Sequence, residues 1–106
     1  MIKVGNDIVL ISRIEKSIKN ERFLNEAFTE KERKHCKNAQ SFAGVYAAKE
    51  AYFKALGTGI TRRLNTVEIL YDEKGKPYIS GEKSCDVSVS LDGDYAFAVV
   101  IMWEQI

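Results

Sequence analysis

The chain has 106 residues, the length of one domain, with 45% hydrophobic and 29% charged residues and a single proline. This composition is typical of a folded globular protein and argues against a disordered or low-complexity chain. Because 16 basic residues nearly balance 15 acidic ones, the charge argues against a nucleic-acid-binding protein, and we expect one domain over residues 1–106.

The N-terminal half is predicted to form a strand and then helices. Residues 2–11 alternate and are rich in β-branched side chains, which is typical of a strand. Ser12 and Glu15, three positions apart, resemble the capping box that begins many helices. Thr29 and Glu32 repeat the pattern before a second helix. We expect these two helices to be followed by a third, longer one.

The third helix is expected to begin after Ser41 as its N-cap and to stop at Gly57. Its apolar side chains surround nearly the whole circumference, which is typical of a buried helix. It nevertheless carries Lys49, Glu50 and Lys54. Burying an unpaired charge costs several kcal/mol, so these side chains need partners or a ligand.

Two hairpins are predicted in the C-terminal half. From residue 66 the apolar period changes to two, and residues 73–77 form a turn before extended chain resumes. Residues 86–91 alternate again, residues 92–94 turn, and residues 95–103 form a long apolar strand. Helices segregated from antiparallel hairpins predict an α+β fold in which an antiparallel sheet packs on the long central helix.

One face of the long helix combines small and charged side chains. Ala43 and Ala47 lie on the same face as Glu50 and Lys54, so two methyl groups leave room beside a carboxylate and an ammonium, as in a cleft wall. The alternative is an ordinary ion pair between Glu50 and Lys54, four positions apart. Lys49 lies on another face, where it either snorkels past apolar side chains or meets an anion.

Asp7 is the second unusual charge, because it follows Gly5 and Asn6 inside an otherwise apolar strand. The glycine indicates that another part of the chain or a ligand approaches closely. If Asp7 and Glu50 converge, two carboxylates without His or Cys suit Mg²⁺. Asp7 could instead be a strand-end aspartate that accepts backbone hydrogen bonds. The spacing does not decide between these alternatives.

The chain shows no membrane-spanning or secretory pattern. Its longest apolar run, residues 96–103, is much shorter than a bilayer-spanning helix, and the N-terminus lacks a signal-peptide pattern. Cys36 and Cys85 have no CxxC spacing, which favours free thiols over a disulfide or a zinc site. We expect a cytoplasmic protein without a membrane or nucleic-acid partner.

Several segments together match one known family. They are residues 5–8, 13–14, 28–32, 42–59, 75–77, 87–90 and 92–96, with Gly81. They resemble the holo-acyl-carrier-protein synthases, nearly residue for residue over 42–59. The resemblance covers almost the whole chain and implies the 4'-phosphopantetheinyl transferase fold. It also implies a homotrimer with active sites between neighbouring subunits.

The resemblance implies an enzyme of fatty acid biosynthesis that uses Mg²⁺. Such an enzyme transfers 4'-phosphopantetheine from coenzyme A to a serine of apo acyl carrier protein and releases adenosine 3',5'-bisphosphate. Asp7 and Glu50 would ligate the metal, and Lys54 would complete the catalytic set by contacting the coenzyme A phosphates. The expected coenzyme A contacts are Lys49, Lys54, Gly57, Thr58, Gly59 and Ser90. The residues expected to dock the acyl carrier protein are Arg13, Lys16, Lys19 and Arg22.

Two departures from the family pattern bear on the nucleotide. Val45 stands where many members have Arg, and Leu91 stands where they have His after the serine. The resemblance associates both positions with the 3'-phosphate of coenzyme A. His35 lies in a charged helical stretch and is expected on the surface rather than in catalysis.

Two other functions compete with this interpretation. A homologue that binds carrier protein or nucleotide without turnover would also explain the two departures, although Asp7, Glu50 and Lys54 are retained. A small nucleic-acid-binding module is disfavoured by the charge balance and by the lack of an RNA-binding aromatic motif.

Overall fold

The computed structural model describes residues 1–58 and 63–104. The elements in chain order are β1 (Ile2–Leu10), α1 (Ile11–Ser17), α2 (Glu21–Ala27), α3 (Glu30–His35), α4 (Ala39–Leu56), the 3-10 turn η2 (Leu64–Thr66), β2 (Ile69–Tyr71), β3 (Pro77–Ile79), β4 (Cys85–Asp92) and β5 (Tyr95–Trp103). No helix in the described ranges is long and apolar enough to cross a membrane. The predicted α+β arrangement is confirmed.

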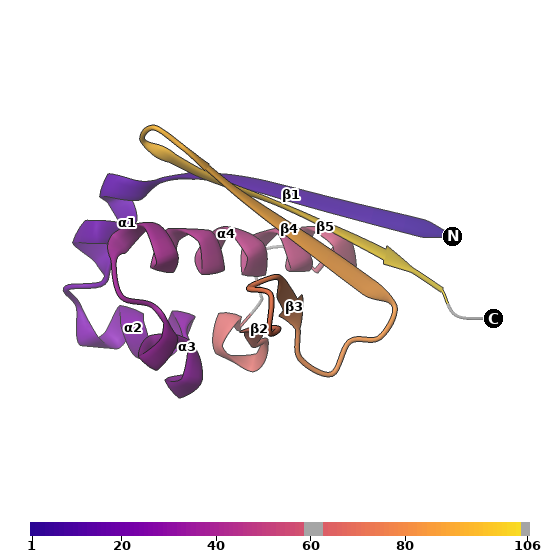
Figure 1. Ribbon diagram of the computed structural model, residues 1–106, viewed down its shortest axis with the longest axis horizontal. Coiled ribbons are helices and arrows are strands. Elements are labelled where there is room, and N and C mark those ends of the chain that lie inside the picture. Colours follow the sequence, from indigo (N-terminus) through magenta and orange to yellow (C-terminus); the bar gives the residue numbers. More distant parts are fainter. Residues whose placement is uncertain (59–62, 105–106) are drawn as a thin grey trace.

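The main sheet has the strand order β1-β5-β4, with both pairs antiparallel. It covers one side of α4, and α2, α3 and the β2–β3 hairpin lie on the other side (Figure 1). Alternate residues of β1 and β5 point toward α4, so Val9, Ala96, Ala98 and Val100 are buried. The long helix is therefore enclosed by sheet and helices, as its apolar circumference predicts.

Two of the predicted helix starts are wrong. α1 has no side-chain cap, because β1 runs directly into it and the Ile11 amide donates to the Asp94 carbonyl at 2.8 Å. α4 begins at Ala39 rather than after Ser41, and the Asn38 side chain accepts from the Ser41 amide at 2.9 Å. In both cases the predicted cap lies inside the first turn, where another oxygen has already satisfied the free amides.

The other predicted signals are confirmed. Thr29 and Glu32 form a full capping box at the start of α3. Gly57 ends α4 in the left-handed conformation with a φ of 80°, which is the usual role of glycine at a helix C-terminus. Cys36 and Cys85 are free thiols.

Candidate active site

Asp7 is brought to α4 by the close packing of β1 on that helix. Alternation along β1 places Gly5, Asp7 and Val9 on the face toward α4. A Cβ atom at Gly5 would collide with the Ala51 carbonyl and lie 2.5 Å from the Ala55 amide nitrogen. The missing side chain at Gly5 therefore allows strand and helix to touch, and Asp7 follows two residues later on the same face.

The Asp7 carboxylate accepts a hydrogen bond from Lys54 at 3.0 Å. The Lys54 side chain is 54% exposed and that of Asp7 only 15%. Burial raises the pKa of Asp7 above its ordinary value, and the hydrogen bond and positive charge of Lys54 lower it. The negative charge of Glu50 raises this pKa further, and the positive charge of Arg13 lowers it. Asp7 therefore lies within the electrostatic reach of three charged side chains, Glu50, Lys54 and Arg13.

Glu50 is buried on α4, one helical turn before Lys54. Of the alternatives that the sequence left open, the ordinary pair of Glu50 with Lys54 is not what the structure records, because Lys54 pairs with Asp7. Asp7 lies inside β1 rather than at its end, and its carboxylate accepts a hydrogen bond from Lys54. The two carboxylates and one ammonium share the space between β1 and α4.

This donor set fits a small divalent cation. The negative charge of Glu50 contributes to the raised pKa of Asp7, so a cation beside the two carboxylates would relieve their repulsion, and oxygen-only donors favour Mg²⁺ over zinc. Within residues 1–58 and 63–104, no group of three His, Cys, Asp or Glu side chains gathers that could hold a metal alone. Mg²⁺ usually keeps waters and substrate phosphate oxygens as further ligands, so two carboxylates can be enough protein ligands for it.

Arg13 links this site to the predicted docking surface. Its guanidinium lies 5.8 Å from the centre of the Tyr46 ring and within electrostatic reach of Asp7. Lys16 and Lys19 are exposed beside it. Arg22 is also exposed and pairs with Glu26 at 2.9 Å. The contact between Arg13 and Tyr46 had no clear signal in the sequence, because the two residues lie on different helices.

Comparisons with known proteins identify the family of this chain. The family model of the 4'-phosphopantetheinyl transferase superfamily matches residues 3–100. The chain belongs to the 4'-phosphopantetheinyl transferase superfamily. Holo-[acyl-carrier-protein] synthase of Fusobacterium nucleatum is 38% identical over 96% of this chain and 98% of the relative. The synthase of Nautilia profundicola is 42% identical over 93% of this chain and 97% of the relative.

Solved structures of this superfamily have the same fold. The holo-[acyl-carrier-protein] synthase of Helicobacter pylori, in complex with coenzyme A, matches with a TM-score of 0.87 and 33% identity over 94% of this chain and 99% of that one. The synthase of Bacillus anthracis, in complex with CoA (3',5'-ADP), matches with a TM-score of 0.82 and 34% identity over 94% of each chain. The predicted phosphopantetheinyl transferase fold is confirmed.

The Lys49 side chain does not face the candidate active site. Its side chain is 0% exposed, and its ammonium pairs with Glu32 and donates to the Ala27 carbonyl at 2.8 Å. Burial lowers the pKa of Lys49, although Glu32 opposes that change. The predicted coenzyme A contact of Lys49 is therefore not supported, because its donors are directed into the core. The sequence left two alternatives for Lys49, and the structure shows the contact with an anion, which is the Glu32 carboxylate.

The remaining predicted nucleotide contacts lie in three places. Gly57 and Thr58 are exposed at the end of α4, one turn beyond Lys54. Gly59 lies outside the described residues. Ser90 is exposed on β4, paired with Phe97 on the face of the sheet that points away from α4. Asp7 pairs with Ala98 and points to the opposite face, so one chain does not bring Ser90 and Asp7 together.

The two departures from the family pattern differ in position. Val45 is 1% exposed in the core of α4, and the association of its position with the 3'-phosphate stays a prediction. Leu91 is exposed near the β4–β5 turn. His35 lies on the surface as predicted, stacked on Tyr71 with ring centres 4.2 Å apart.

Proposed function

We propose that this chain is a Mg²⁺-dependent holo-acyl-carrier-protein synthase of fatty acid biosynthesis that acts in the cytoplasm as one domain. It transfers 4'-phosphopantetheine from coenzyme A to a serine of apo acyl carrier protein and releases adenosine 3',5'-bisphosphate. The observation that carries this proposal is the convergence of Asp7, Glu50 and Lys54 between β1 and α4. Relatives named for this activity align over nearly the whole chain.

The side chains divide the chemistry between them. Asp7 and Glu50 would hold Mg²⁺, which when bound neutralises pyrophosphate charge and fixes its geometry. Lys54, half exposed beside Asp7, is placed to stabilise the charge that develops on the leaving phosphate. Gly57 and Thr58, just beyond it, present backbone rather than bulky side chains to the nucleotide.

Arg13 and its neighbours form the proposed carrier-protein surface. Arg13, Lys16 and Lys19 are exposed basic residues that would attract an acidic carrier protein. Because Arg13 also influences Asp7, a carrier protein docked here would deliver its serine next to the metal ligands.

The homotrimer is supported by the outer face of the main sheet. Exposed apolar side chains gather there, each at least 40% exposed: Ile2, Val4, Ile8, Phe97, Ile101 and Trp103. A contiguous exposed apolar surface of this kind is typical of a protein interface. Ser90 lies on this same face, so a second copy packed against it could supply Ser90 to the site of its neighbour.

Mass spectrometry tests the proposed reaction. Apo acyl carrier protein incubated with this chain, coenzyme A and Mg²⁺ should gain the mass of one phosphopantetheine, and EDTA should abolish the gain. Asp7→Asn serves as the matched control, since it keeps the shape of the site and removes one ligand charge. Coenzyme A binding without any mass gain would indicate instead a homologue that binds without turnover.

A further inference from the structure

The proposed carrier-protein surface of α1 continues onto α2. An open hollow of about 460 Å³ lies where the two helices meet. It is lined by Lys16, Ser17, Asn20, Arg22, Phe23 and Glu26. The hollow therefore brings two of the predicted docking residues, Lys16 and Arg22, together with a carboxylate, that of Glu26.

This part of α2 lies close to the candidate active site. The Arg13 guanidinium lies 5.8 Å from the centre of the Tyr46 ring, and the ring centres of Tyr46 and Phe23 are 5.9 Å apart. Arg13 is also within electrostatic reach of Asp7. A protein interface of standard size buries about 800 Å² on each partner, a patch roughly 30 Å across. A carrier protein that brings its serine to Asp7 across Arg13 would therefore also cover Phe23 and the hollow beside it.

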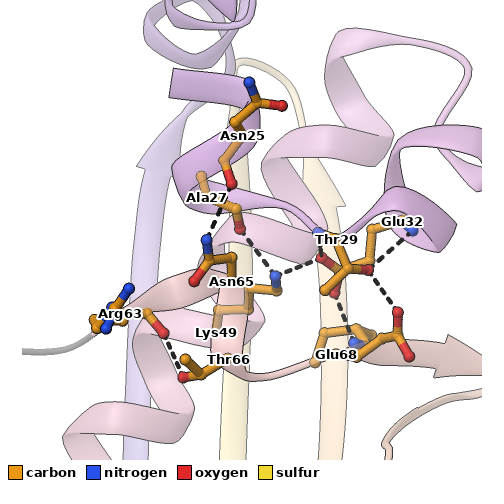
Figure 2. Close-up of polar contacts among 10 residues, drawn as sticks. Asn25, Ala27, Thr29, Glu32, Lys49, Arg63, Asn65, Thr66 and Glu68 are labelled. Atoms are coloured by element: carbon orange, nitrogen blue, oxygen red, sulfur yellow. Dashed lines mark hydrogen bonds and ion pairs between the residues drawn. The ribbon is translucent and has the colours of Figure 1, made fainter. Parts of the chain in front are cut away.

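The C-terminal end of α2 is held in place by two hydrogen bonds (Figure 2). The Lys49 ammonium donates to the Ala27 carbonyl at 2.8 Å, and the Asn65 side chain donates to the Asn25 carbonyl at 3.1 Å. Glu26 lies between these two carbonyl groups in the sequence. The backbone that carries the Glu26 carboxylate is therefore fixed beside the docking surface.

Arg22 is already paired before any partner binds. Its Nε atom donates to Glu26 Oε1 at 2.9 Å, one helical turn away. The two side chains are 86% and 63% exposed, so the pair is weak and open to exchange. A carboxylate of an incoming protein that takes Arg22 must displace Glu26, and the displaced Glu26 then lies beside a like charge. Like charges across an interface disfavour binding.

We propose that Glu26 is a specificity-determining residue for the carrier protein. It neutralises Arg22 and adds a negative charge to the docking surface. The attraction of an acidic carrier protein then comes from α1, through Arg13, Lys16 and Lys19. Carrier proteins that place a carboxylate opposite α2 bind more weakly than those that place a neutral or basic side chain there. The inference rests on the proposed function.

Binding of an acidic apo acyl carrier protein, followed by fluorescence anisotropy of the labelled carrier, tests this inference. Glu26→Gln removes the charge and keeps the length of the side chain. We expect it to lower the Kd for the carrier about three- to fivefold. The KM for coenzyme A should not change, because the substitution lies on the carrier side of the site. Equal Kd values for wild type and Glu26→Gln overturn the inference.

Glu30→Gln is the matched control. Glu30 pairs with Lys34 at 3.3 Å, also four positions apart and exposed, but on α3 and outside the hollow. Both variants raise the net charge by the same amount, so a general attraction of the acidic carrier would lower both Kd values equally. We expect no change of Kd for Glu30→Gln. A decrease equal to that of Glu26→Gln contradicts a specific role of Glu26.

Arg22→Gln measures the neutralisation of Arg22 directly. It should change the Kd less than about twofold while Glu26 is present. In the Glu26→Gln background Arg22 is released, and its loss should raise the Kd about three- to fivefold. If Arg22→Gln has the same effect in both backgrounds, Glu26 does not neutralise Arg22 and the inference is wrong.

A failure of the proposed function gives a different result. If wild type neither binds the apo acyl carrier protein nor modifies it in the mass-spectrometric assay, the proposed function is wrong and the inference falls with it. If wild type binds and modifies the carrier while Glu26→Gln leaves the Kd unchanged, only the role of Glu26 is wrong.

Discussion

The contact between β1 and α4 at Gly5 makes a sharp prediction for Gly5→Ala. The added methyl group would overlap the Ala51 carbonyl and lie 2.5 Å from the Ala55 amide nitrogen. Both are backbone atoms of a buried helix, so no side-chain rotation relieves the overlap and β1 must move away from α4. Overpacking costs about 1–3 kcal/mol when side chains adjust, and we expect at least about 3 kcal/mol here.

This loss should appear in urea unfolding and in thermal melting at one fixed protein concentration, because the proposed homotrimer would make stability depend on concentration. For a chain of this size, about 3 kcal/mol lowers the Tm by more than about 10 °C. The displacement of β1 also moves Asp7 from Glu50, so phosphopantetheine transfer should fall even below the melting temperature.

Gly44→Ala is the matched control. A Cβ atom at Gly44 would meet only the Val89 Cγ1 atom at 3.1 Å, a side-chain contact that can adjust. Alanine gains about 1 kcal/mol over glycine inside a helix, so this variant should change the free energy of unfolding by less than about 1 kcal/mol. If Gly5→Ala melts like Gly44→Ala, the close packing of β1 on α4 is wrong.

Three further predictions concern single side chains. Asp7→Asn should lower Mg²⁺-dependent transfer at least about 100-fold in the mass-spectrometric assay. It should be no less stable than wild type at pH 7, because the raised pKa of Asp7 means that its ionised form costs stability once the pH exceeds that pKa. Lys54→Gln should lower kcat/KM about tenfold or more and change the free energy of unfolding by less than about 1 kcal/mol in urea titrations, since its ion pair is half exposed. Burial raises the pKa of Cys36 to about 12 and that of Cys85 to about 11, so both thiols should react slowly with a disulfide reagent at pH 8 and at once in denaturant.

The apolar periodicity predicted most of the fold, because the strands of the main sheet bury one face along their length and α4 is buried on nearly all sides. The alternation in β4 and β5 and the capping box at Thr29 are local signals, and the structure confirms them. The caps at Ser12 and Ser41 failed because capping depends on where the preceding chain goes, and here Asp94 and Asn38 supply the oxygens. Asn38 is itself a preferred cap residue close to Ser41, so its signal was present in the local sequence and was missed, whereas the contact of Ile11 with the distant Asp94 has no local signal.

Lys49 illustrates a different limit. The helical wheel separated it from Glu50 and Lys54, but a wheel does not tell which side of a helix faces solvent. Its partner Glu32 was visible only as a capping residue, and the same carboxylate that closes the capping box also accepts from Lys49. Only the packing of α3 against α4 shows that Lys49 is buried with Glu32, whereas Lys54 pairs with Asp7 at the candidate site.

Gly5 carries the information that selects the face of α4. A strand approaches a helix backbone most closely where both lack large side chains, and Gly5 faces Ala51 and Ala55. Each of these alanines directly follows a charged residue, Glu50 or Lys54, in the sequence. The contact that seats the strand therefore also brings the carboxylate and the ammonium to the edge of β1, where Asp7 lies two residues from Gly5 on the same face. In such a site, a glycine in a strand and an alanine after each charged helical residue are as informative as the charges themselves.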